Sequence, residues 1–369
     1  MERQKPMSHA TRKNIGVIGL GIIGRGIAGN LRRKGFPVYV WNRSPRSVPN
    51  FVGSPGEVAE ICNYIQIFVS DDDALLQTVE QLSGKLTPRH VVVAHSTVAP
   101  DSMRAAGEIV DRRKAQFVEA PFTGSKGAAE KGELVFYVSG SDAALREARP
   151  ILEASSKEII EIGATIGQAS AIKIATNMIT AASVQATAEA LALVQALGLP
   201  LEKFVEAMHS NASHSTTLAM KLPKMLGRDF EPHFSVKHML KDMQIANQIG
   251  LSHYLDLGVT AAARDQLLEQ MHWGHGDDDY SVVARKYLHE PAPGAGEELQ
   301  LGEEDEQTNA SEPIASLAEA ETHGQQDATP EVSPVPPVGL TSGAAANETR
   351  RLRRGFFKQL LSRVSSGEK

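Results

Sequence analysis

The first half of the chain alternates short apolar, β-branched runs with helical stretches. Strands that alternate with helices indicate βαβ units, in which neighbouring strands run parallel. The pattern therefore predicts an α/β domain with a mainly parallel sheet over residues 14–166. The predicted strands are Ile15–Ile18, Val38–Trp41, Tyr64–Val69, Val91–Ala94, Gln116–Glu119 and Leu134–Val138.

After residue 166 the pattern becomes helical throughout. From Gln168 to Leu197 an Ala-rich stretch of about 30 residues contains neither Pro nor Gly. Because alanine is the best helix former, we predict one long helix of about 45 Å at 1.5 Å per residue. Residues 167–289 are expected to form an all-helical domain, with further helices at 201–209, 215–225, 235–250, 256–272 and 280–288.

Both ends of the chain differ from this body. Residues 1–13 are polar and mildly basic, which predicts a flexible start and not a secretory signal. Residues 290–349 are rich in Pro, Gly, Ala, Ser and Glu. Such a segment cannot bury enough apolar surface to offset its ordering entropy, so we expect a disordered acidic linker.

The last 20 or so residues, 350–369, are predicted to form a basic amphipathic helix. Arginine and lysine lie mostly off its apolar face. We expect this helix to bind a membrane surface or a protein partner, or to fold back on the acidic linker; the alternative is a functionally neutral extension. The apolar face comprises Leu352, Phe356, Phe357, Leu360, Leu361 and Val364.

Composition narrows the classes of function. Cys62 is the chain's one cysteine, so an intramolecular disulfide is impossible and a cytoplasmic location is expected. No apolar stretch approaches the roughly 20 residues that span a bilayer. Residues 291–349 carry a charge of −12 and residues 350–369 carry +6, which together equal the net −6 of the whole chain. The body is therefore neutral and gives no argument for nucleic-acid binding.

A glycine-rich motif, Gly19-Leu20-Gly21-Ile22-Ile23-Gly24, follows the first predicted strand and opens a helix. The motif alone is a weak signal, but the order strand, glycines, helix is that of a dinucleotide-binding fold. Gly19 permits a tight turn, Gly21 lets the backbone approach a pyrophosphate, and Gly24 allows close packing of helix on strand. The free N–H groups and dipole of the helix N-terminus favour phosphate binding.

The residues after the second predicted strand indicate which dinucleotide binds. About 20 residues beyond the glycines, NAD enzymes usually carry an acidic residue for the ribose hydroxyl. This chain has Asn42-Arg43-Ser44 there, so no carboxylate repels a 2′-phosphate, and Arg43 and Ser44 can bind one. We therefore predict that NADP(H) is preferred over NAD(H); the alternative is that Arg43 is a solvated surface residue.

The segment Glu119–Gly127 begins at the end of a predicted strand, where ligands bind in open α/β sheets, and it contains the turn Thr123-Gly124-Ser125. Its backbone N–H groups and hydroxyls suit a substrate carboxylate, although an ordinary turn has the same composition. Lys173 and Asn177 share one face of the long helix. Lys173 stands in an otherwise uncharged stretch, so it either reaches water or takes part in chemistry.

A further charged pair, Lys241-Asp242, follows His238 on a later predicted helix. A solvated charged face is the expected reading for such a pair.

Several motifs together resemble the β-hydroxyacid dehydrogenase family over about residues 14–288. This family includes 3-hydroxyisobutyrate dehydrogenase, tartronate semialdehyde reductase and the glyoxylate/succinic semialdehyde reductases. The stretches NRS and TGSKGAAEKGEL are most similar to the last group. In chain order the motifs are GLGIIG, VWNRS, VSD, HSTVAP, EAPFTGSKGAAEKGEL, KIATNM and LKDMQIA.

The resemblance implies a Rossmann domain, a long interdomain helix and a helical domain that supplies oligomer contacts, hence a homodimer or homotetramer. It implies that Lys173 is the catalytic lysine and that Asn177 orients the substrate. It also implies that the substrate carboxylate is bound by Thr123, Gly124 and Ser125. The residues that would flank the cofactor ribose and nicotinamide are Thr97 and Val69-Ser70-Asp71, and Lys241 would close over the cofactor.

Two residues depart from the family pattern. Thr123 stands where serine is usual, which keeps the hydroxyl and adds a methyl group that narrows the pocket. His95 stands before the STV motif where aspartate or another residue is commoner. We interpret His95 as a packed or surface residue and not as a catalytic one.

The expected function is NADPH-dependent reduction of a small carboxylate substrate, an aldehyde or 2-oxo acid such as glyoxylate or succinic semialdehyde, to the hydroxy acid. Lys173 would be the general acid/base. Alternatives are a 3-hydroxyisobutyrate or tartronate semialdehyde dehydrogenase, an imine reductase, whose members generally lack the lysine, and a 6-phosphogluconate dehydrogenase, whose arginine pair is not evident. A non-catalytic NADPH-binding scaffold would need neither Lys173 nor the Thr-Gly-Ser turn.

Overall fold

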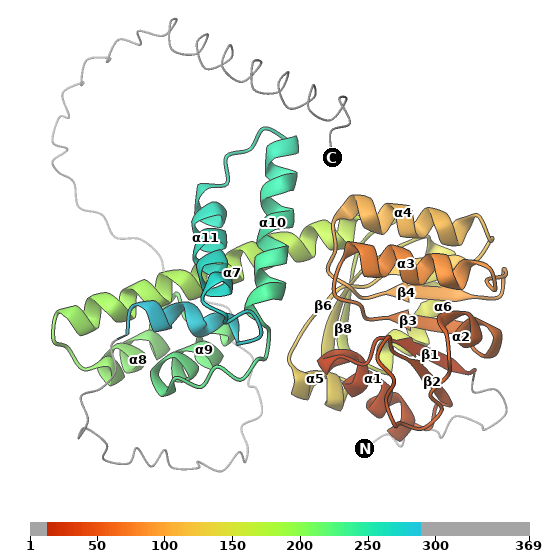
Figure 1. The fold of residues 1–369 in the computed structure, drawn as a ribbon, viewed down its shortest axis with the longest axis horizontal. Coiled ribbons are helices and arrows are strands. Elements are labelled where there is room, and N and C mark those ends of the chain that lie inside the picture. The colour runs from red at the N-terminus through yellow and green to blue at the C-terminus, as the bar shows by residue number, and fades with distance from the viewer. Residues whose placement is uncertain (1–12, 289–369) are drawn as a thin grey trace, which may run out of the picture. The chain divides into compact units, whose positions relative to one another are not determined.

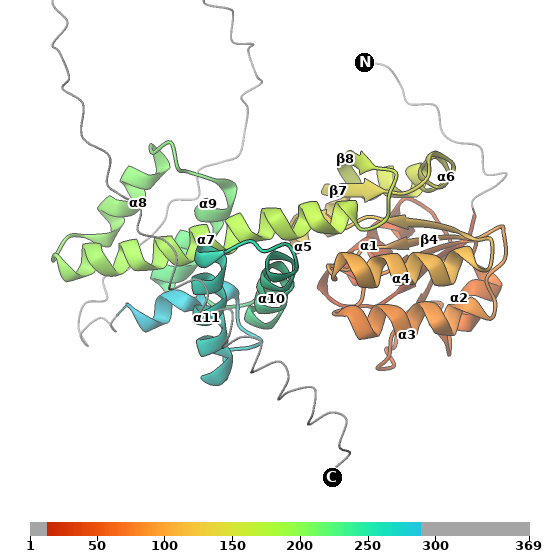
Figure 2. The ribbon, with the colours of Figure 1, turned by 90° about the horizontal axis from the view of Figure 1, so that it is seen from above.

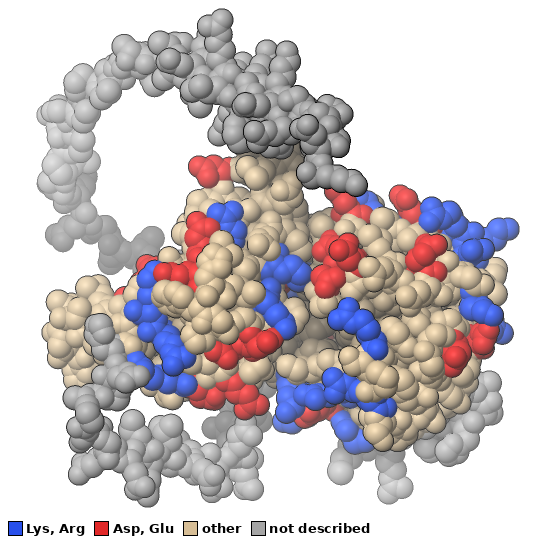
Figure 3. Space-filling view, in the orientation of Figure 1, with Lys and Arg blue, Asp and Glu red and all other residues tan. Residues whose placement is uncertain are grey.

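The computed structural model describes residues 13–288 (Figure 1). The predicted acidic linker and basic amphipathic helix, with the partners expected for that helix, lie outside the described residues, as do residues 1–12 of the predicted flexible start. Over residues 13–288, none of the helices combines the length and apolar character needed to cross a membrane. On the face drawn in Figure 3, acidic and basic side chains of the described residues are interspersed.

The described strands form one sheet in the order β2-β1-β3-β4-β5-β7-β6, with β8 beside β7. The first five strands in this order, from β2 to β5, are parallel to one another. Every residue of β1, β3 and β4 is buried, which explains their continuous apolar runs. The predicted α/β fold with a mainly parallel sheet is confirmed. These strands are β1 (Ile15–Ile18), β2 (Val38–Trp41), β3 (Tyr64–Ile67), β4 (Val91–Ala94) and β5 (Gln116–Glu119).

The sheet continues with β6 (Phe122–Thr123), β7 (Leu134–Ser139) and β8 (Ser156–Gly163). β7 runs antiparallel to β5 and β6 and parallel to β8. The sequence pattern predicted β5 and β7 but neither β6 nor β8. β6 is only two residues long, and β8 is half-buried to exposed, with lysine and glutamate interrupting its apolar residues.

Six helices cover this sheet, and most begin at a side-chain cap. Ser54, Asp71, Ser125 and Ser141 each accept a hydrogen bond from a backbone N–H in the first turn of the helix that follows. The helices are α1 (Ile22–Arg33), α2 (Pro55–Ile61), α3 (Asp72–Ser83), α4 (Pro100–Asp111), α5 (Lys126–Lys131) and α6 (Asp142–Glu153).

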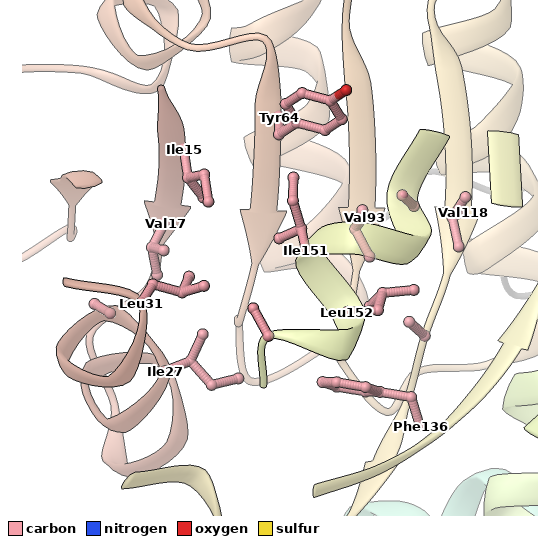
Figure 4. Packing of buried hydrophobic residues seen from close by; sticks show 14 of the residues in the cluster. Ile15, Val17, Ile27, Leu31, Tyr64, Val93, Val118, Phe136, Ile151 and Leu152 are labelled. Atoms are coloured by element: carbon pink, nitrogen blue, oxygen red, sulfur yellow. The ribbon is translucent and has the colours of Figure 1, made fainter. Parts of the chain in front are cut away.

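One face of the sheet packs on α1 and α6 to form a continuous core. Ile27 of α1 and Leu152 of α6 lie against Phe136 of β7 and the valines of the parallel strands (Figure 4). Ile27, Leu152 and Phe136 are at most 1% exposed. Full burial of a side chain of this size stabilises the fold by about 1.5–3 kcal/mol, so this core holds the strand ends, where ligands bind, in fixed positions.

The rest of the described chain is helical and is organised around α7 (Gln168–Ala196), a single 29-residue helix (Figure 2). The predicted long helix is confirmed to within one residue. Ala181, Val184 and Ala188 pack in the core that α7 shares with its neighbours. These are α8 (Leu201–His209), α9 (Thr216–Gly227), α10 (Val236–Ser252) and α11 (Gly258–His272).

The last predicted helix differs, because residues Tyr280–Lys286 form a 3₁₀ segment. The Asp279 carboxylate caps this segment by accepting a hydrogen bond from the backbone N–H of Ser281. It also forms a buried ion pair with Lys221 of α9, whose Nζ lies 2.7 Å from Asp279 Oδ1. Asp279 also accepts bonds from the backbone of His233 and Phe234. This buried acid therefore holds the start of the short segment against α9.

Candidate active site

The glycine-rich turn between β1 and α1 has two glycines that packing requires. Gly19 has φ +93°, and a Cβ there would lie 1.9 Å from the Phe68 carbonyl oxygen. A Cβ on Gly24 would lie 2.0 Å from the carbonyl oxygen of Gly19. At Gly21, by contrast, no heavy atom of the described chain other than those of Gly21 and its two chain neighbours lies within 4 Å of the Cβ position. The turn is therefore closed on its protein side and open at Gly21, as a backbone that approaches a pyrophosphate requires.

Helix α1 begins at this opening. Its N-cap is Gly21, which has no side chain to satisfy the first N–H groups of the helix. Free N–H groups and the positive end of the helix dipole suit a phosphate. The turn and helix thus fit the diphosphate of a nicotinamide dinucleotide.

Asn42 has a structural role that the sequence did not indicate. Its Oδ1 accepts a hydrogen bond from Leu20 N at 2.9 Å, and its Nδ2 donates to the Ser44 carbonyl at 2.8 Å. Asn42 therefore fixes the glycine turn to the end of β2. Arg43 and Ser44 are exposed beyond it, so both side chains remain available to a ligand.

Asp71 connects the segment after β3 to two cations. As N-cap of α3 it accepts hydrogen bonds from Ala74 N at 2.9 Å and from Ser70 Oγ at 2.5 Å. The Ser70 hydroxyl lowers the pKa of Asp71 most, and the positive charges of Lys241 and Arg43 lower it further. Arg43, Asp71 and Lys241, which lie far apart in the sequence, therefore share one electrostatic environment. Beside them, Val69 N donates to Ser96 Oγ at 2.9 Å.

Lys241 of α10 joins the helical part of the chain to the loop after β4. Its ammonium donates a hydrogen bond to the Thr97 carbonyl oxygen, and its Nζ lies 2.9 Å from Asp242 Oδ1. The structure thus places Lys241 and Thr97 together, as a residue that closes over the cofactor would require.

Lys173 lies on α7 and is partly buried. Burial lowers the pKa of its ammonium to about 8; Asp242 opposes this shift and Lys241 adds to it. Asn177, one turn further along α7, donates to Asp242 Oδ2 at 2.6 Å. Lys173 is therefore within the field of a carboxylate that Asn177 and Lys241 hold in place. A lysine with a lowered pKa exchanges protons near neutral pH, as a general acid or base must.

Asp242 itself is completely buried, so the predicted solvated charged face at Lys241-Asp242 is wrong for the aspartate. Buried Met239 and Ala246 lie three residues before and four residues after it, at spacings of one helical turn. That apolar spacing was the signal that could have placed Asp242 on the inner face of its helix.

The Thr123–Ser125 turn requires glycine at its centre. Gly124 has φ +140°, and a Cβ there would lie 2.7 Å from Leu134 Cδ2, so glycine is required. Ser125 caps α5 by accepting a bond from Ala128 N at 3.3 Å, which leaves its hydroxyl proton free to donate. Thr123 and Gly124 are exposed. The turn can therefore offer hydroxyl and N–H donors to a carboxylate.

His95 is packed inside the sheet, as the sequence reading allowed. Its ring stacks on Phe68 with the centroids 4.3 Å apart, and burial lowers its pKa to about 3. The imidazole is therefore neutral and carries a single ring proton, which Nδ1 donates to the Ala120 carbonyl oxygen at 2.8 Å. Nε2 must then accept, and the atom placed 3.0 Å from it is Gln66 Oε1. Because two acceptors cannot share a hydrogen bond, the Gln66 amide is assigned the opposite orientation, in which its NH₂ group donates to Nε2. His95 therefore has a packing role and does not act as an acid or base.

Two family models match this chain. Residues 14–163 match the NAD-binding domain of 6-phosphogluconate dehydrogenase. Residues 167–287 match the NAD-binding domain of NADP-dependent 3-hydroxyisobutyrate dehydrogenase. Over 279 residues the chain is 30% identical to glyoxylate/succinic semialdehyde reductase 1 of Arabidopsis thaliana, covering 73% of this chain and 96% of that protein. The chain belongs to the 3-hydroxyisobutyrate dehydrogenase-like family of β-hydroxyacid dehydrogenases.

The chain is also similar to a second curated protein and to a solved structure. The chain is 29% identical over 289 residues to the cytokine-like nuclear factor N-PAC of Danio rerio, covering 76% of this chain and 63% of that longer protein. The fold matches the crystal structure of 3-hydroxyisobutyrate dehydrogenase from Salmonella typhimurium with a TM-score of 0.69 at 22% identity, over 74% of this chain and all of that one.

As a member of this family, the protein is an NAD(P)-dependent oxidoreductase that acts on CH–OH groups. Its cofactor is a nicotinamide dinucleotide. The open Gly21 and the N-terminus of α1 are the parts of the structure that fit the diphosphate of this cofactor.

Proposed function

We propose that the protein reduces a short aldehyde acid or 2-oxo acid to the hydroxy acid with NADPH, and that Lys173 is the general acid. The observation that carries this proposal is the partly buried Lys173, whose pKa is lowered to about 8 beside the buried Asp242. The Arabidopsis relative named for glyoxylate and succinic semialdehyde supports this substrate class.

Each group has its own part in the proposed reaction. The reduced nicotinamide, when bound, supplies the hydride. The Lys173 ammonium donates a hydrogen bond to the substrate carbonyl oxygen, stabilises the negative charge that grows there, and transfers its proton to that oxygen. Asn177 holds the Asp242 carboxylate in place, and the negative charge of Asp242 favours the ammonium form of the buried lysine. The Thr123–Ser125 turn binds the substrate carboxylate and so fixes the distance between the carbonyl group and Lys173.

The direct test is NADPH oxidation by the purified chain with a panel of substrates. The panel contains glyoxylate, succinic semialdehyde, tartronate semialdehyde and a cyclic imine. We expect turnover of at least one aldehyde acid and none of the imine. Turnover of the imine alone would contradict the proposal and favour an imine reductase.

The preference for NADPH rests on the exposed Arg43 and Ser44 after β2. A charge-assisted hydrogen bond to a phosphate contributes about 1.5–3 kcal/mol. Arg43→Ala should therefore raise KM for NADPH by roughly 10–100-fold, since 1.36 kcal/mol is a factor of ten, with little change for NADH. Arg89→Ala, at another exposed arginine of the same domain, is the control and should alter neither. Equal losses with both cofactors would show that Arg43 does not read the 2′-phosphate.

The pH dependence should have opposite signs in the two directions of the reaction. Reduction needs the Lys173 ammonium, so kcat should be constant at low pH and fall as the pH rises through about 8. Oxidation of the hydroxy acid needs the free amine, so its kcat should rise through the same region. Steady-state assays between pH 6 and about 10 measure both limbs. Profiles that move in the same direction would rule out a single residue that changes roles between acid and base.

A further inference from the structure

Glu119 is a buried acid for which the proposed chemistry has no use. It is the last residue of β5 and its side chain is fully buried. Its backbone is paired on both sides, with Ala94 of β4 and with Ser139 of β7. The carboxylate therefore projects from one of the most rigid points of the sheet.

The Glu119 side chain caps α7 from a distance of 50 residues in the sequence. Its Oε1 accepts hydrogen bonds from Ala169 N at 2.5 Å and Ser170 N at 3.4 Å, and its Oε2 accepts from Ser170 Oγ at 3.1 Å. The local N-cap, Gly167 with φ +100°, has no side chain to do this. Burial raises the pKa of Glu119, while these donors and the Gly167 N–H stabilise its anion.

The position of this cap relates it to both halves of the site. Lys173 lies one helical turn beyond Ala169, a rise of about 6 Å along the axis. Thr123, the first residue of the proposed carboxylate-binding turn, follows Glu119 by four positions in the chain. One rigid side chain thus connects the strand that leads into the substrate turn with the helix turn that precedes the lysine.

We propose that Glu119 is a positioning residue. By anchoring the first turn of α7, it sets the position of Lys173 along the helix axis relative to the Thr123–Ser125 turn. The proposal rests on the proposed function, because it states that the contact between Glu119 and α7 affects the rate of reduction. A cap that only stabilises the helix would make the same contact without that effect. Displacement of a reacting group by about 1 Å can cost about 10²-fold in rate, so a small shift of α7 is enough to be measured.

The test uses Glu119→Gln and Ser170→Ala in the full chain. Glu119→Gln keeps the size of the side chain but replaces one acceptor oxygen by a donor. Ser170→Ala removes only one hydrogen bond and therefore perturbs folding less. We expect kcat to fall roughly 10-fold for the first variant and a few-fold for the second. The Kd for NADPH should stay within about 2-fold, because neither residue lies at the glycine turn.

Two further readouts separate positioning from stability. A loosened α7 start hydrates Lys173, so the alkaline limb of kcat should move above its wild-type value of about 8. Amide hydrogen exchange should rise in residues 168–174 and nowhere else. Ser141→Ala, which removes the cap of α6, is the matched control. It should lower Tm and leave the kcat profile unchanged.

The outcomes are distinct. Faster exchange with wild-type kcat and an unmoved pH limb would make Glu119 a structural cap only and overturn the proposal. Wild-type exchange in both variants would overturn the anchor itself. A wild-type enzyme that turns over none of the acids would contradict the proposed function, and the exchange data would still report whether Glu119 anchors α7.

Discussion

Replacement of Lys173 by alanine should lower kcat for reduction by at least about 10²-fold, while the Kd for NADPH changes little. The ammonium contributes in the transition state, where charge develops on the carbonyl oxygen and a proton must follow. It stands on α7, whereas the open glycine turn that fits the diphosphate lies between β1 and α1. Loss of the lysine therefore removes chemistry without removing the cofactor site.

Three comparisons make this result specific to Lys173. Lys173→Met keeps most of the side-chain volume and should lose as much activity as the alanine variant. Lys157→Ala, at an exposed lysine of β8, should behave as wild type. Stopped-flow measurement of the hydride-transfer step would show whether the loss lies in chemistry. A Lys173→Ala enzyme with wild-type turnover would remove the assignment.

The second large effect is expected at Gly21. A valine there meets open space within 4 Å of its Cβ and has an N-cap backbone at φ −66°, ψ −167° that any residue adopts, so the fold should be retained. The same side chain occupies the approach to the N–H groups of α1. We therefore expect NADPH affinity to fall by more than about 10²-fold, as several phosphate hydrogen bonds of about 1.5–3 kcal/mol each are lost.

A glycine in equally open surroundings provides the control. Gly84 follows α3 with no heavy atom within 4 Å of its Cβ position, and Gly84→Val should bind NADPH normally. Fluorescence titration of NADPH and thermal unfolding together separate binding from folding. Tight NADPH binding by a folded Gly21→Val chain would show that the cofactor does not enter over this turn.

The parts of the fold that were predictable are those in which local pattern and burial agree. β1, β3 and β4 are buried on both faces, so their sequence reads as uninterrupted apolar runs. α7 was predictable because its packing uses small residues that also favour the helix locally. β8 was not, because it is only partly covered and its lysine and two glutamates interrupt the apolar residues that mark a strand.

The site was predictable where a residue's type alone suggests its chemistry. Lys173 stood out as a lone charge in an apolar helix, and the glycines stood out by spacing. Asp242 was interpreted as a solvated charge and Glu119 was given no role, because the importance of both lies in contacts made across 65 and 50 residues of sequence. Asn42 was expected at the cofactor, yet its amide is engaged with the backbone of the glycine turn. Tertiary hydrogen bonds of this kind leave no local pattern.

The most direct test of the central claim is a crystal structure of the chain with NADP⁺ and a short hydroxy acid. We expect Lys173 Nζ within hydrogen-bond distance, about 2.6–3.2 Å, of the substrate hydroxyl, with the substrate carboxylate on the Thr123–Ser125 turn. If instead the amine of Lys173 pointed away from the nicotinamide while substrate was bound elsewhere, the proposed chemistry would be contradicted.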